Sequence, residues 1–95
     1  MKNDELFRIE FSNRFNKDRK AASHKVKVAL REALDIFYED PVSKTLRNHS
    51  LAQLGKRYHG LWSINVTDDY RAIYRKEGTT IVFIMLRTHE QLYGK

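Results

Sequence analysis

Apolar residues take every second position between residues 6 and 11. Phe7, Ile9 and Phe11 lie on one side of this pattern, and aromatic residues favour extended backbone. Because a period of two matches a strand with one buried face, we expect a strand over residues 6–11.

Two helices are expected to follow this strand. Ser12 is of a residue type that caps helix N-termini, so a basic helix is expected to begin there and to end near Ala22. A second helix is expected over residues 23–39, because one apolar stripe recurs there at helical spacing. Pro41 ends it, since the residue before a proline is pushed out of the α region. The stripe consists of Val26, Leu30, Ala33, Leu34 and Phe37.

The second half of the chain favours strands after a long connector. Residues 42–61 are polar and basic with three leucines as anchors, and a short strand or turn within them stays open. Strands at 62–67, 70–76 and 80–86 are separated by short turns and predict an antiparallel meander. The last of them is apolar on both faces, so we expect it at the centre of the sheet, before a short tail over residues 87–95. The expected fold class is α+β: an N-terminal strand, a two-helix hairpin and a three-stranded antiparallel meander.

The chain has the size and composition of one small domain. Its 95 residues contain no linker rich in proline, glycine or serine, so we expect a single domain over residues 1–95. The absence of cysteine excludes disulfides, thiolate metal sites and a cysteine nucleophile. The MKNDELFRIEF segment lacks the apolar core of a signal peptide, and no stretch approaches the ~20 apolar residues of a membrane span. We therefore expect a cytoplasmic protein with no membrane partner.

Basic residues outnumber acidic ones and give the chain a formal net charge of +6. Such a charge attracts polyanions and speeds association with them. Nucleic acid fits better than a membrane surface, because no expected helix combines a basic face with a broad aromatic one.

Two segments carry a resemblance to a known family. Residues 60–75, GLWSINVTDDYRAIYR, and residues 81–94, IVFIMLRTHEQLYG, resemble the C-terminal half of the RelE/ParE toxin superfamily. The THEQLYG end of the second segment, together with NHSL at residues 48–51, is most similar to the YafQ branch. The resemblance covers residues 42–94 by motif, and the first half of the chain matches only in its order of elements.

This resemblance implies a fold, an activity and partners. The fold would be two helices on a mostly antiparallel, curved sheet, with the active site on the open face. The activity would be ribosome-dependent mRNA cleavage in the decoding site, without a metal ion or another cofactor, alongside rRNA contacts. The protein partner would be a small antitoxin that forms a hetero-oligomer with the toxin. A cationic open sheet face suits an acidic antitoxin segment that folds on binding.

RNA cleavage of this kind makes three chemical demands. A ribose 2′-OH attacks the adjacent phosphate, so its proton must be removed, the leaving 5′ oxygen must be protonated and charge on the phosphorus must be stabilised. Imidazole suits the proton steps, because its pKa lies near working pH. A guanidinium suits the phosphate, because its planar fork holds phosphate oxygens and stays charged.

The resemblance assigns these catalytic roles to five residues. His49 and His89 lie at positions where YafQ-like toxins carry functional histidines, and His89 is the first candidate. Asp69 matches an acidic residue of the same set, and it would orient an imidazole or accept the proton itself. Arg87 and Tyr93 resemble the residues that RelE-like members use on the transition state and on the attacked nucleotide.

Further polar side chains are expected to contact RNA. One of them, Asn65, departs from the YafQ pattern, which has another histidine at that position. An amide holds a phosphate or a base edge but exchanges no proton, so the departure implies either lower activity or a transfer of the proton steps to the remaining groups. The expected RNA-binding residues are Lys56, Arg57, Asn65, Arg71 and Arg75.

Each candidate also has an interpretation without function. The histidines are then solvated surface residues, Asp69 forms a turn, and the arginines lie on a solvated sheet face. A metal site is not expected, because His49, His59 and His89 lack short ligand spacing and no cysteine supports them.

Two other functions stay open for the same fold. The first is a ParE-like toxin that inhibits DNA gyrase through protein contacts and cleaves no RNA. The second is a degenerate homologue whose remaining role is to bind its antitoxin.

Overall fold

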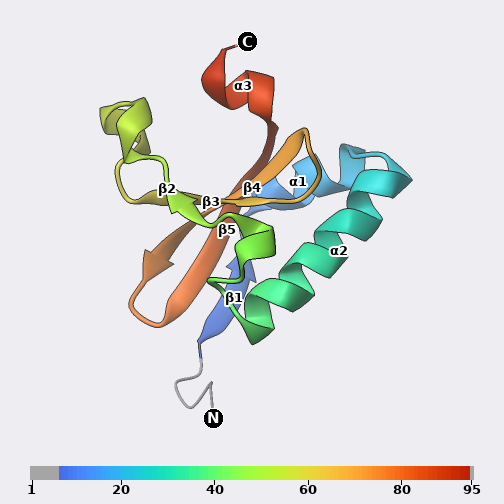
Figure 1. Cartoon of the computed structure of the whole chain (residues 1–95), viewed down its shortest axis with the longest axis horizontal. Coiled ribbons are helices and arrows are strands. Elements are labelled where there is room, and N and C mark those ends of the chain that lie inside the picture. Colours follow the sequence, from blue (N-terminus) through green and yellow to red (C-terminus); the bar gives the residue numbers. More distant parts are fainter. Residues whose placement is uncertain (1–6, 95) are drawn as a thin grey trace.

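The computed structural model describes residues 7–94, which form a five-stranded sheet with helices on both of its faces (Figure 1). Helices α1 and α2 cover one face, and the short helix α3 lies over the other, open face. Leu6 and Lys95 belong to the expected first strand and tail and lie outside the described residues. The elements are β1 (Arg8–Phe11), α1 (Asn13–Ala21), α2 (His24–Glu39), η1 (Lys44–Leu46), β2 (His49–Ser50), η2 (Ala52–Leu54), η3 (Lys56–Tyr58), β3 (Leu61–Asn65), β4 (Tyr70–Glu77), β5 (Thr80–Thr88) and α3 (His89–Tyr93), where η denotes a 3-10 helix.

Serine caps fix the start of both long helices. The Ser12 hydroxyl accepts from the backbone N–H of Phe15 at 3.0 Å and donates to the carbonyl of Ile84 at 2.9 Å, which ties the start of α1 to β5. Ser23 accepts from the backbone N–H of Val26 and begins α2. These starts confirm the helices that were expected from the sequence, and four of the five residues of the predicted stripe on α2 are buried.

The strand order is β1-β5-β4-β3-β2, so the last strand lies inside the sheet as its double-sided apolar pattern predicts. β1 pairs with β5 in parallel, and the other neighbours are antiparallel. The α+β class and the expected strands are confirmed.

Strand β2, helix α3 and the three 3-10 helices of the connector were not predicted as such. Strand β2 lies in the expected connector and pairs with β3, where His49 is opposite Ser63. Helix α3 lies in the expected tail, and a capping box between Thr88 and Gln91 begins it. Elements of two and five residues are too short to show a period in the sequence, so pairing and capping define them instead.

An extra residue in β5 decides which side chains reach the open face. Ile73 is opposite Met85 while Tyr74 is opposite Phe83, so Ile84 is a bulge. Phe83 contacts the core under the helices, whereas Ile84 and Met85 pack on the open face. The bulge therefore shifts the in–out alternation of the side chains by one residue, so that after Ile84 the odd-numbered residues of β5 point to the open face.

The two faces of the sheet carry two separate clusters of buried residues. The larger one lies under α1 and α2 and is rich in aromatic rings, such as Phe15, Phe37 and Phe83. The smaller one, which we call the second core, lies on the open face and holds α3 and the β2–β3 connection against the sheet. Its buried members are Leu51, Ile73 and Leu92.

Candidate active site

His49 projects from β2 with its ring held at one nitrogen. Its Nδ1 lies 2.8 Å from the carbonyl oxygen of Arg47, and a carbonyl only accepts, so Nδ1 carries the proton. Arg47 has a φ of 47°, and this left-handed backbone shapes the turn that leads into β2. In the neutral ring, Nε2 then carries the lone pair, which is the arrangement a general base needs.

Asn48 fixes the backbone next to this histidine. Its amide nitrogen donates to the carbonyl of Pro41 at 2.8 Å, and its Oδ1 accepts from the hydroxyl of Tyr74 at 2.9 Å. Burial raises the pKa of the Tyr74 hydroxyl, so this group stays protonated and keeps donating. The segment before β2 is thus anchored to both the end of α2 and the centre of the sheet.

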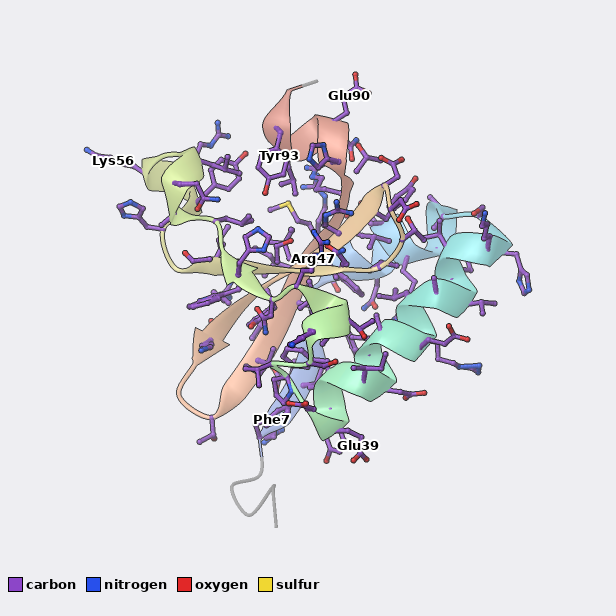
Figure 2. The ribbon with its side chains drawn as sticks, in the orientation of Figure 1. Phe7, Glu39, Arg47, Lys56, Glu90 and Tyr93 are labelled. Carbon is purple, nitrogen blue, oxygen red and sulfur yellow. The ribbon has the colours of Figure 1, made fainter. Side chains whose placement is uncertain are left out.

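Helix α3 brings the ring of Tyr93 to His49 and stacks the ring of His89 beside Tyr93. His89 and Tyr93 are one helical turn apart, and their ring centroids lie 4.5 Å from each other. The hydroxyl of Tyr93 lies 3.5 Å from Nε2 of His49, and Figure 2 shows Tyr93 projecting from α3 toward the sheet. His89 is exposed, so its imidazole is open to a substrate. We call His49, His89 and Tyr93 the imidazole cluster.

Asp69 reaches this region through its main chain. Its carbonyl accepts from the backbone N–H of His89 at 2.7 Å, which fixes the β3–β4 turn against the start of α3. The residue is exposed, and the acceptor at Nδ1 of His49 is the Arg47 carbonyl and not a carboxylate.

Two arginines meet where β4 and β5 approach α3. Arg71 is directly opposite Arg87 in the strand register. Nη1 of Arg71 donates to the carbonyls of Thr67, Asp68 and Tyr70 at 2.9–3.1 Å, so this guanidinium stabilises the turn. Arg87 is half-buried, and its Nε lies 3.3 Å from the sulfur of Met85. Within residues 7–94, its two terminal nitrogens donate no hydrogen bond.

The remaining predicted RNA-binding residues lie in three places. Asn65 is half-buried at the end of β3 and opposite Arg71, so it belongs to the same row as Arg87. Lys56 and Arg57 are exposed on η3. Arg75 lies farther along β4 and pairs with Glu77 through an Nε–Oε2 contact of 2.5 Å, away from the imidazole cluster.

Sequence reasoning assigned no role to Arg47 and Asn48, although Asn48 belongs to the NHSL segment that carried the resemblance. A carbonyl acceptor and a positive φ depend on backbone geometry, which has no signature at the level of residue type. The position directly before a candidate histidine is the signal that points to Asn48.

The described residues contain no group of three or more His, Cys, Asp or Glu side chains placed to hold a metal ion. Among residues 7–94, there is also no helix with the length and apolar character needed to cross a membrane.

The chain matches one family model and several solved structures. The model is described as a bacterial toxin of type II toxin-antitoxin system, YafQ, and it matches residues 7–94. YafQ from E. coli strain BL21(DE3) aligns with a TM-score of 0.75 at 25% identity, over 94% of this chain and all of that one. A chain of the E. coli DinJ–YafQ complex gives 0.74 at 25% identity with the same coverage.

A more distant match shows the fold alone. The YoeB/ParE toxin from Agrobacterium tumefaciens aligns with a TM-score of 0.67 at 16% identity, over 86% of this chain and 98% of that one. No curated protein sequence matches the chain.

Proposed function

The chain belongs to the YafQ family of bacterial type II toxin–antitoxin toxins, and from that premise we propose that it is a metal-independent endoribonuclease that cleaves mRNA on the ribosome. The observation that carries this proposal is the meeting of His49, His89 and Tyr93 from two elements that are distant in the chain.

The cluster supplies both proton steps of 2′-OH attack. Nε2 of His49 removes the 2′ proton as the O2′–P bond forms, since its Nδ1 proton is held by the Arg47 carbonyl. The imidazolium of His89 protonates the 5′ oxygen as the P–O5′ bond breaks. The products are a 2′,3′-cyclic phosphate and a 5′-hydroxyl, so protons balance and no co-reactant is consumed.

Charge and orientation come from the neighbouring groups. Arg87 stabilises the extra negative charge on the phosphorane oxygens with its free terminal nitrogens. Tyr93 holds the attacked nucleotide beside His49. Asp69 keeps α3 in place through its carbonyl, and its exposed carboxylate is available to the imidazole of His89 when RNA is bound.

The other cationic side chains and the amide of Asn65 guide the RNA strand. Arg71 and Asn65 continue the row of Arg87 across the sheet, and Lys56 and Arg57 line the opposite rim on η3. Arg75 extends the positive surface along β4. Contacts of this kind position the phosphate backbone and carry no sequence information.

An acidic antitoxin is the proposed protein partner in the cytoplasm. The similar YafQ of E. coli has been solved in complex with DinJ. The net charge of +6 on this chain favours rapid capture of an acidic segment.

The test is tightly controlled expression followed by mapping of mRNA 5′ ends. We expect new ends within translated codons for the wild type and a loss of at least about 100-fold for His89→Gln, because general acid catalysis contributes roughly 10²–10⁴. His24→Gln is the control. His24 is the first residue of α2, which covers the other face of the sheet, and its side chain is exposed. Intact mRNA in growth-arrested cells contradicts the proposal. Inhibition of gyrase supercoiling without RNA cleavage favours the ParE-like alternative.

A further inference from the structure

A groove of about 580 Å³ lies on the open face between η3 and α3. Leu61, Ile84 and Met85 are among the residues that line it, and they belong to the apolar packing of the second core. This volume is in the range of small-ligand sites. Arg87 also lines the groove, so the groove is continuous with the proposed site of the scissile phosphate.

The polar groups around the groove offer donors. Arg57 and Arg87 are guanidiniums, which have no acceptor. The Oε1 atom of Gln91 already accepts from the backbone N–H of Thr88 at 2.8 Å, so this side chain has its amide N–H groups left to offer. A ligand that matches such a groove carries negative charge and several acceptor atoms.

The rim also offers flat surfaces for stacking. The guanidinium of Arg57 lies 5.9 Å from the ring centroid of Tyr58, within the range of a cation–π interaction. Tyr58 is half-buried against the second core, so its ring is a fixed part of the wall. Unpaired RNA bases stack on aromatic rings and on guanidinium planes, and each such contact tolerates any base.

We propose that this groove binds the mRNA nucleotide next to the scissile phosphate, with its base against Tyr58 and Arg57 and its phosphate between Arg57 and Arg87. The inference rests on the proposed ribonuclease function and adds a subsite to it. The short helix α3 lies between the groove and the imidazole cluster. His89 and Tyr93 are one helical turn apart and share one side of α3, whereas Gln91 lies on the opposite side and lines the groove.

Binding is tested with a 2′-O-methyl RNA trinucleotide, which lacks the attacking hydroxyl and stays intact. Its titration into labelled protein is followed by NMR at Tyr58 and at the side-chain amide of Gln91. We expect both sets of signals to shift. We expect Arg57→Ala to raise the dissociation constant about five-fold. We also expect it to reduce the steepness of log K against log salt by about 0.7, the value for one phosphate contact on a single strand.

Two further variants separate this subsite from general charge. Lys27→Ala removes one positive charge from an exposed position of α2, and we expect it to leave the affinity and the salt slope unchanged. Gln91→Glu keeps the capping box, because glutamate suits that position, and it adds a negative charge to the groove. We expect it to weaken binding more than Arg57→Ala does.

Three results overturn the inference. The first is that Arg57→Ala and Lys27→Ala change the RNA affinity equally. The second is that RNA does not shift the NMR signals of Tyr58 and Gln91, and the third is that an acidic peptide shifts these signals while RNA does not. The mapping of mRNA ends is a separate readout, so cleavage by the wild type combined with any of these results removes the subsite and leaves the ribonuclease function standing. NMR shifts at the groove combined with no mRNA cleavage in cells would instead contradict the proposed ribonuclease function.

Discussion

The imidazole of His49 and the hydroxyl of Tyr93 lie 3.5 Å apart, although 44 residues separate them along the chain. One side chain belongs to a strand of two residues and the other to a helix of five. Elements this short are not stable alone. The two side chains therefore meet because the sheet and the second core hold both elements. We expect a substitution that weakens either support to lower the rate of RNA cleavage.

Asn48→Ala tests the support on the side of His49. The change removes hydrogen bonds to Pro41 and Tyr74, so we expect a loss of about 1–3 kcal/mol in the free energy of unfolding. Because the segment before β2 is then less well fixed, cleavage by the folded protein is expected to fall about ten-fold. Chemical denaturation and single-turnover cleavage measure the two effects.

Asn48→Asp is the matched comparison for this variant. It keeps an oxygen that accepts from Tyr74 and loses the amide that donates to Pro41. An intermediate effect on both stability and cleavage is expected. If Asn48→Ala lowers stability and leaves the cleavage rate of the folded protein unchanged, Asn48 is structural and does not position His49.

Leu92→Ala tests the support on the side of α3. Leu92 is buried in the second core, and truncation of a buried leucine costs about 2–5 kcal/mol when the surroundings relax little. Because α3 has a single buried residue, we expect local detachment and faster amide exchange over residues 89–93. Cleavage is expected to fall more than the change in global stability explains.

A leucine on the other face of the sheet provides the control. Leu34 packs partly against the core under the helices, away from α3. Leu34→Ala is expected to lower stability and to leave cleavage by the folded protein unchanged. Equal losses of cleavage in the two leucine variants would show that α3 has no special role.

The regular elements were predictable because their local signals agree with the packing. Ser12 caps the helix that its residue type indicates, and the apolar stripe of α2 is buried as its spacing indicates. The double-sided apolar pattern of residues 80–86 places that strand inside the sheet. The parallel pairing of β1 with β5 has no such local signal, because it joins residues about seventy positions apart.

The geometry of the candidate site was less predictable than its composition. The five residues named as catalytic came from resemblance, and their roles stay proposals. That Arg47 contributes a carbonyl, and that Asp69 contacts His89 through its main chain, follows from backbone conformation. The bulge at Ile84 also has no signal in the sequence, yet it decides on which face of the sheet the side chain of Arg87 lies.

Tyr74 predicts a dependence of stability on alkaline pH. Burial raises the pKa of its hydroxyl, so the folded state holds this proton more tightly than the unfolded state. The resulting stabilisation is fully present below about pH 10, the ordinary value for tyrosine, and is lost as the pH rises through the raised value of the folded state.

Tyr74→Phe isolates this contribution. The variant loses the hydrogen bond to Asn48, which costs about 1 kcal/mol at neutral pH. The difference in unfolding free energy between wild type and variant is expected to shrink as the pH rises above about 10. Denaturation at a series of pH values measures it, and a constant difference across that range contradicts the assignment.

In the proposed reaction, a ribose hydroxyl of the mRNA attacks its own phosphate within the imidazole cluster. The most direct measurement is cleavage of ribosome-bound mRNA that carries one 2′-deoxynucleotide at the cleaved position, with the all-ribose message beside it. We predict that the all-ribose message yields 2′,3′-cyclic phosphate ends and that the deoxy message stays intact at that position. Cutting of the deoxy message at the same position and rate would contradict attack by the 2′ hydroxyl.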